Sequence, residues 1–294
     1  MKDIKKPFEE KRTNFLNEYK KQKTINIIVL IVALVIVLVF FIVFRNNMVP
    51  ALVVAFIAVV GLFTYTQVIK KKLNDKTTKY INDFYSITSE SVLSESGFDN
   101  LDFIPEMELS RDEVQRSEIM KEINYVKSRN VHVGKVNDRD IRIADLLFKV
   151  QVTPKESKVA FCGKFIQVDL DKMLEEKMVM YLKPATEAMG PNMLDGLELV
   201  EDNDKYAIYS SDKKFVNSHK KLIKAFSELQ VNEYILDCTV TFLKDEMTIA
   251  ISCSDNIMVV PLFDELNEDC FVALSNALKV VRKMIDELDK KKQE

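Results

Sequence analysis

Two apolar runs dominate the first quarter of the chain, and neither contains a charged residue. Residues 25–44 form the first run and residues 48–69 the second, and only Arg45, Asn46 and Asn47 separate them. A helix rises about 1.5 Å per residue, so each run is long enough to cross the roughly 30 Å hydrocarbon core of a bilayer. The pattern therefore predicts a transmembrane helical hairpin.

Two other structures share part of this pattern. A secretory signal peptide has a shorter apolar core and a small-residue cleavage site, whereas the first run ends in Phe-Phe-Ile-Val-Phe and a second run follows at once. The buried core helix of a soluble protein rarely stays apolar on every face over such a length. We therefore favour two membrane spans over both alternatives.

Lysines flank the hairpin on its open side. The positive-inside rule places ends rich in Lys and Arg in the cytoplasm, and the connecting turn holds only Arg45. We therefore predict a multi-pass cell membrane protein with two spans and both termini in the cytoplasm. The same lysines are expected to meet anionic lipids of the inner leaflet; they are Lys20, Lys21, Lys23, Lys70, Lys71 and Lys72.

Residues 1–24 form a basic segment that carries Phe8, Phe15 and Tyr19 at near-helical spacing. One interpretation is an amphipathic helix that lies on the inner leaflet. The other is a poorly ordered tail with aromatic residues placed by chance. The sequence leaves both open.

Residues 70–126 are predicted to form a helical stalk and a linker. Apolar residues at helical intervals continue the second span as a helix that stops near Gly97. A linker follows. Ser110 and Glu113 then have capping-box spacing, which predicts a helix from there to about Val126.

Beyond this point the period of the apolar residues changes from 3.6 to 2, which predicts strands. Residues 127–294 are thus expected to form a cytosolic α+β domain, a mainly antiparallel sheet with two or three packing helices. One helix follows a cap at Asp212 and runs to about Leu229, and the last covers about 268–288. The expected strands are 131–136, 141–152, 159–169, 178–182, 206–209, 234–243, 246–252 and 257–260.

The last helix carries apolar residues at heptad spacing, namely Phe271, Leu274, Leu278, Val281, Ile285 and Leu288. Such a seam pairs with a second helix or packs on the protein's own sheet or stalk. A homo-oligomer through this helix therefore stays open beside intramolecular packing.

Charge is segregated along the chain. Residues 1–79 carry 14 Lys and Arg against 5 Asp and Glu, whereas residues 80–294 carry 28 against 40. The basic part suits anionic lipids, and the acidic part is repelled by them. The acidic domain also argues against nucleic acid as a partner, because nucleic-acid binding requires a basic face.

A search for chemistry finds no catalytic, cofactor-binding or metal-binding constellation. Gly-rich phosphate loops and the common hydrolase and metalloprotease motifs are absent from the sequence. His219 borders the apolar stripe of its helix and is expected to be structural, and strand alternation places His132 at the surface. Asp169 and Asp171 form an Asp-x-Asp pair that is typical of a strand exit. We expect no cofactor.

The cysteines are scattered, without a Cys-x-x-Cys pair; they are Cys162, Cys238, Cys253 and Cys270. This usage is typical of reduced cytosolic thiols that are buried as small hydrophobic residues. Asn137 and Asp138 predict a hairpin turn. Gly163 lies inside a strand pattern and predicts a bulge or a close backbone approach.

Three segments resemble a known family: Phe161-Cys-Gly-Lys-Phe-Ile-Gln-Val-Asp169, Tyr206-Ala-Ile-Tyr-Ser-Ser-Asp212 and Thr241-Phe-Leu-Lys-Asp-Glu-Met-Thr-Ile-Ala-Ile251. The family is the domain-of-unknown-function family numbered 3137, of bacterial membrane proteins with two N-terminal spans and a cytosolic α+β region. The resemblance covers about residues 25–288. A Leu-Thr-Pro often seen in that family is replaced here by Lys220-Lys221-Leu222. The resemblance implies the fold and the anchor but no activity.

The sequence therefore favours a binding protein over an enzyme. The leading hypothesis is a membrane-anchored cytosolic domain that binds a protein partner, of identity unknown, or acts as a scaffold or sensor. The alternative is an accessory subunit of a membrane enzyme or transporter, with a site that a partner completes.

Overall fold

A computed structural model describes residues 5–45, 48–119, 123–153, 156–183 and 194–290. The chain divides into two compact units. We call the first the helical unit; it comprises Asp3–Phe84 and Pro261–Leu266. We call the second the sheet unit; it comprises Tyr85–Val260 and Asn267–Glu294. Asn46 and Asn47 of the predicted turn lie outside the described residues.

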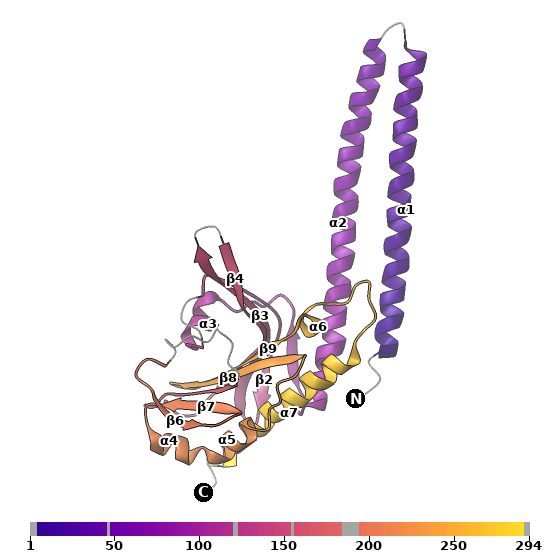
Figure 1. Cartoon of the computed structure of the whole chain (residues 1–294). Coiled ribbons are helices and arrows are strands. Elements are labelled where there is room, and N and C mark those ends of the chain that lie inside the picture. The colour runs from indigo at the N-terminus through magenta and orange to yellow at the C-terminus, as the bar shows by residue number, and fades with distance from the viewer. Residues whose placement is uncertain (1–4, 46–47, 120–122, 154–155, 184–193, 291–294) are drawn as a thin grey trace. The chain divides into compact units, whose positions relative to one another are not determined.

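The helical unit is built from two long helices, α1 (Lys5–Val43) and α2 (Met48–Glu95), the latter continuing into the sheet unit from Tyr85 (Figure 1). Pro50 lies in the first turn of α2, where its missing N–H costs nothing. The predicted hairpin of apolar helices is thus present. The predicted helix stop is also confirmed, since α2 ends at Glu95 and Gly97 has a φ of 81°.

The first residues of α1 pack on α2. Phe8 is 2% exposed, and its ring meets that of Phe84 edge-on at 4.8 Å. Phe15 stacks on Tyr80 with centroids 4.6 Å apart. From Lys5 onward the basic segment is therefore an ordered helix, so the interpretation as a poorly ordered tail is wrong for those residues. Its aromatic face is used for helix–helix packing.

The sheet unit contains a nine-stranded sheet in which all pairs of neighbouring strands are antiparallel, in the order β1-β2-β3-β4-β9-β8-β5-β7-β6. The strands are β1 (Leu101–Ile104), β2 (Tyr125–Val136), β3 (Arg139–Thr153), β4 (Glu156–Asp169), β5 (Met178–Leu182), β6 (Glu198–Asp202), β7 (Tyr206–Ser210), β8 (Ile235–Leu243) and β9 (Glu246–Cys253). The predicted α+β class is confirmed.

Both faces of this sheet are covered (Figure 1). On one face, α3 (Arg111–Arg116) and the segments beside it cover a buried cluster that includes Val114, Leu146, Phe148 and Phe165. On the other face lie the end of α2 and four further helices: α4 (Lys213–Ser218), α5 (Lys220–Phe226), α6 (Asp255–Met258) and α7 (Glu268–Lys290).

The heptad seam of α7 is buried within the sheet unit, with each of its six residues no more than 8% exposed. Ser275 and Ser96 share a hydrogen bond, and Arg282 Nη1 donates to the carbonyl of Gly97 at 2.6 Å. The seam therefore packs within the chain itself. The homo-oligomer stays a prediction, and the buried seam gives it no support.

Two local predictions are confirmed. Asn137 and Asp138 have φ values of 52° and 66°, as a two-residue hairpin turn with the twist of its strands requires. At Gly163 a Cβ atom would lie 1.9 Å from the carbonyl oxygen of Ile251, because β4 and β9 approach closely there.

Several predicted elements are wrong in detail. The helix after Ser110 has its capping box but ends at Arg116, because Glu118 takes a φ of 48°; β2 begins at Tyr125, and residues 120–122 lie outside the described part. The predicted strand at 257–260 is replaced by α6. The helix after Asp212 is broken at His219 into α4 and α5. Two short strands, β1 and β6, were not predicted.

Candidate functional site

The long helices expose their apolar side chains. Their most apolar stretches, within Phe8–Val43 and Leu52–Glu95, are 0% and 6% buried. Leu34 is 62% exposed and Phe56 is 70% exposed. A core helix of a soluble protein buries such residues. Both helices are therefore long and apolar enough to span a membrane, by length and composition.

Polar groups of the hairpin fit the same environment. Asn26, near the start of the first apolar run, accepts a hydrogen bond from the Tyr65 hydroxyl of the neighbouring helix at 3.3 Å. An amide that is paired in this way costs less in hydrocarbon than a free one. The six flanking lysines predicted to meet anionic lipids are all exposed: Lys20, Lys21, Lys23, Lys70, Lys71 and Lys72.

The sheet unit contains a buried ion pair that the sequence patterns did not predict. Asp145 of β3 and Lys164 of β4 are directly opposite each other in the sheet, and their side chains form an ion pair with 1% and 11% exposure. Asn130 Nδ2 donates to Asp145 Oδ2 at 2.6 Å. We call these residues, with His132 and Tyr85, the polar core. The sequence signal for this pair was an acidic and a basic residue, Asp145 and Lys164, each inside an otherwise apolar strand segment.

His132 is 4% exposed, so its predicted place at the surface is wrong. Strand alternation does place it opposite Val131, but the end of α2 and α7 cover that face of the sheet. Burial, and after it the charge of Lys164, lowers the pKa of His132 to about 4. The ring therefore stays neutral at physiological pH, with Nδ1 3.0 Å from the Asn130 carbonyl.

A cavity of about 20 Å³ lies beside the polar core, lined by Tyr85, His132 and Lys164 and otherwise mostly by apolar side chains. That is the room of roughly one water molecule. Small-molecule sites are typically some hundreds of Å³. The polar core is therefore too closed for a substrate or a cofactor, and its contacts indicate a structural role.

An open hollow on the opposite face is the better candidate site. It has a volume of about 710 Å³, and we call it the charged groove. Its walls come from the end of α3, the β2–β3 hairpin, the end of β4 and the β8–β9 turn. The lining residues are Glu113, Arg116, Ser117, Val133, Gly134, Lys135, Asp140, Ile141, Arg142, Gln167, Asp169, Met173, Leu243, Lys244, Asp245 and Glu246.

Part of the groove's charge is already paired. Arg142 Nη1 lies 2.8 Å from Glu113 Oε1, and Lys135 Nζ lies 3.6 Å from Asp140 Oδ1. The Lys135–Asp140 pair is exposed and stabilises the fold by less than about 1 kcal/mol, whereas the Arg142–Glu113 pair is half-buried. They fix side chains at the rim and do not close the groove.

Beyond these two pairs, the groove is lined by three carboxylates, Asp169, Asp245 and Glu246, and by two cations, Arg116 and Lys244. Partial burial raises the pKa of Asp169, and the nearby Asp140 and Asp245 raise it further. Gln167 is 8% exposed; its Nε2 donates to Glu246 at 3.0 Å, while its Oε1 has no hydrogen-bond partner within the described structure. Gln167 Oε1 is itself buried, so the acceptors open to a cation or an N–H donor are the exposed carboxylates of Asp169 and Asp245. Met173, 74% exposed, adds an apolar contact.

The remaining residues considered in the sequence have structural roles. His219 Nδ1 donates to the Phe215 carbonyl at 2.8 Å, as expected of a histidine with a structural role. Asp169 ends β4, and Asp171 pairs with the buried Arg139 at 2.7 Å, which confirms a strand exit. In the part of the chain that the structure describes, no three His, Cys, Asp or Glu side chains are grouped to hold a metal.

The cysteines are free thiols, and three of them are buried. Burial raises the pKa of Cys238 well above its usual range and raises those of Cys253 and Cys270 to about 12. Protonated, enclosed thiols are poor nucleophiles. This environment is the one predicted for small buried hydrophobic residues.

Comparisons with known proteins add little to this picture. No protein-family model matches the chain, and no curated protein matches it. Among solved structures, the crystal structure of the mycobacterial trehalose monomycolate transport factor A, TtfA, aligns with a TM-score of 0.38 at 9% identity. The alignment covers 68% of this chain and 94% of that chain. Fold and function must therefore be argued from this chain's own residues, and the family resemblance stays a prediction.

Proposed function

We propose that this protein is a membrane-anchored binding domain: α1 and α2 span the membrane as a hairpin, and the sheet unit binds a partner in the cytoplasm. The observation that carries the anchor is the exposure of the apolar stretches of both helices, 0% and 6% buried. Leaving so many large apolar side chains in water is unfavourable by roughly 25 cal/mol per Å². Lipid removes that cost.

The orientation follows from the flanking charges. Arg45 alone lies at the closed end of the hairpin, whereas exposed lysines flank its open end. A cysteine introduced by Arg45→Cys should react with a membrane-impermeant maleimide on intact cells. A cysteine introduced by Lys71→Cys should react only after permeabilisation, and labelling of Lys71→Cys on intact cells would reverse the orientation.

The charged groove is the proposed binding site. Its exposed carboxylates Asp169 and Asp245 suit a cationic side chain, and the apolar Met173 lines the same groove. The excess of acidic residues beyond residue 80 also attracts a basic partner over a distance. We infer that the groove takes a basic segment of a protein.

Photo-crosslinking in native membranes tests the groove. A photoreactive residue at Met173, which is at the groove, should capture a specific protein, whereas one at Leu199, 48% exposed on the edge strand β6, should not. Reversing the groove's charge with Asp169→Lys plus Asp245→Lys should abolish the capture.

A matched double variant, Glu198→Lys plus Asp204→Lys, makes the same change of charge on exposed residues outside the groove and should leave the capture intact. Equal capture at both crosslinking positions would contradict the binding site. Turnover of a substrate by the purified protein alone would overturn the binding role itself.

A further inference from the structure

The last part of the connection between β9 and α7 is a short segment that packs on the long helices. Pro261–Leu266 belongs to the helical unit and not to the sheet unit on either side of it. We call it the docked loop. It carries Phe263, whose ring is 61% exposed although it lies on a segment held by several contacts.

Hydrogen bonds hold the docked loop to both helices. Arg12 Nη1 donates to the Phe263 carbonyl at 3.1 Å, and the Leu266 N–H donates to Glu9 Oε1 at 3.1 Å. Glu9 and Arg12 pair with each other at 2.6 Å, and the Tyr80 hydroxyl of α2 donates to the Pro261 carbonyl at 3.4 Å. The backbone of the loop is thus fixed on the helices while the Phe263 ring is left outside.

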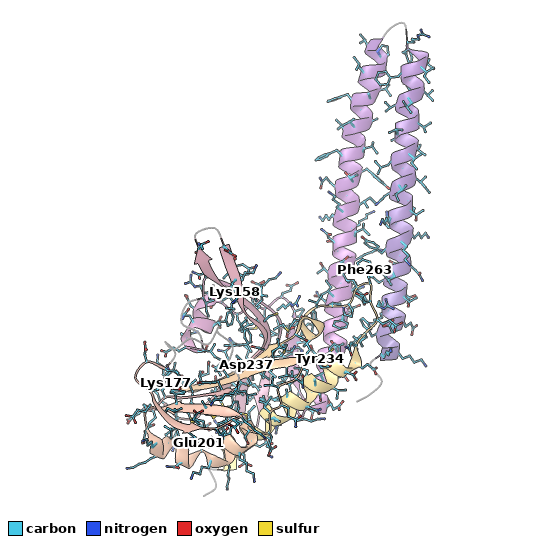
Figure 2. All side chains as sticks on the ribbon, viewed as in Figure 1. Lys158, Lys177, Glu201, Tyr234, Asp237 and Phe263 are labelled. Atoms are coloured by element: carbon cyan, nitrogen blue, oxygen red, sulfur yellow. The ribbon has the colours of Figure 1, made fainter. Side chains whose placement is uncertain are left out.

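The depth of Phe263 relative to the spans follows from helix geometry. Its ring meets Tyr19 of α1 edge-on, with centroids 5.9 Å apart (Figure 2 labels Phe263 beside the long helices). Tyr19 precedes Ile25, the first residue of the apolar run, by six residues, which is about 9 Å along a helix. The headgroup layer of a bilayer is roughly 5–8 Å thick on each side. Tyr19 therefore lies just outside that layer, and the Phe263 ring beside it is within a side chain's length of the headgroups.

We propose that Phe263 is an interfacial anchor, which inserts into the cytoplasmic headgroup layer beside the spans and thereby docks the loop on the membrane surface. Phenylalanine, like tryptophan and leucine, is found on the apolar face of segments that insert at the boundary between headgroups and acyl chains. The exposed lysines Lys20, Lys21 and Lys23 follow Tyr19 directly on α1 and supply attraction to anionic lipid. This inference rests on the proposed membrane anchor.

The test uses tryptophan as a probe, because the chain contains none. Single variants Phe263→Trp, Glu10→Trp and Leu34→Trp are placed in nanodiscs of phosphatidylcholine and phosphatidylglycerol. Glu10 is an exposed residue of the same unit, 15 residues before Ile25 and so about 22 Å from the apolar run. Leu34 lies in the middle of the first run. Nitroxide-labelled lipids, with the label on the headgroup or in the acyl chain, report contact by quenching.

Headgroup nitroxide should quench Phe263→Trp several times more strongly than Glu10→Trp, and acyl-chain nitroxide should quench Leu34→Trp most. Equal, weak quenching of Phe263→Trp and Glu10→Trp, with Leu34→Trp still quenched, would overturn the interfacial anchor and leave the spans intact. Absence of quenching at Leu34→Trp would instead overturn the proposed membrane anchor. The two failures are thus distinguishable.

Discussion

Replacing Lys164 by methionine would leave a buried carboxylate without its cation. Asp145 is 1% exposed at its side chain, and with Lys164 removed Asn130 remains as a neutral donor to it. Methionine keeps most of the apolar stem, so the change removes charge more than volume. Breaking a buried ion pair on one side costs about 3–5 kcal/mol. With a urea dependence of about 2 kcal/mol per M, the unfolding midpoint should fall by about 1.5–2.5 M.

The chain supplies its own reporters of unfolding. Cys238 is 0% exposed and Cys253 is 3% exposed, so both thiols react with a maleimide only when the sheet unit opens. The full chain in nanodiscs is exposed to increasing urea, pulsed with maleimide and examined by mass spectrometry. The fraction of labelled thiol gives the unfolding midpoint without removing any part of the protein.

Lys135→Met is the matched control. Lys135 pairs with Asp140 at 3.6 Å, but both side chains are 65% exposed, so this change should cost less than about 1 kcal/mol. Adding Asp145→Asn to Lys164→Met removes the unpaired charge and should recover part of the midpoint. If Lys164→Met shifts the midpoint no more than Lys135→Met does, the ion pair does not stabilise the sheet unit as argued.

Three further changes test other contacts by the urea midpoint, which for the pH series is read by circular dichroism because thiols barely react with maleimide in acid. Burial holds the pKa of His132 at about 4, against 6.5 for the free side chain, so between these pH values the unfolded chain binds a proton that the folded chain does not. The free energy of unfolding should therefore fall by up to about 3 kcal/mol as the pH drops from 6.5 through 4. His132→Gln should weaken this pH dependence. Gly163→Ala forces a Cβ against the Ile251 carbonyl and should cost about 2–3 kcal/mol, whereas an unchanged midpoint would refute the close approach. Ser110→Ala removes the cap that accepts from the Glu113 N–H at 3.2 Å and should cost about 1 kcal/mol; no loss would show that the capping box does not hold α3.

Local patterns predicted most of the elements because they act over a few residues. The lengths of the apolar runs predicted the hairpin, and period-2 alternation predicted the long strands. The helix cap at Ser110, the turn at Asn137 and the close backbone approach at Gly163 could be predicted from the residue type alone. Element ends were less predictable. The chain leaves α3 because Glu118 takes a left-handed backbone conformation, and no neighbouring Gly or Pro in the sequence predicts it.

The polar core and the groove depend on which strands meet. His132 was expected at the surface because alternation shows which face a residue takes but not whether a helix covers that face. Asp145 and Lys164 become partners only through the β3–β4 register. Groove residues from Glu113 to Glu246 lie more than a hundred positions apart in the chain, so pattern alone could not group them.

Membrane insertion of α1 and α2 is the claim on which the anchor, the orientation and the role of Phe263 all depend, and extraction of native membranes tests it most directly. The full chain should stay in the pellet after ultracentrifugation in alkaline carbonate and enter the supernatant only with detergent, because two apolar helices are held in the hydrocarbon core. Recovery of the protein in the supernatant without detergent would contradict the account.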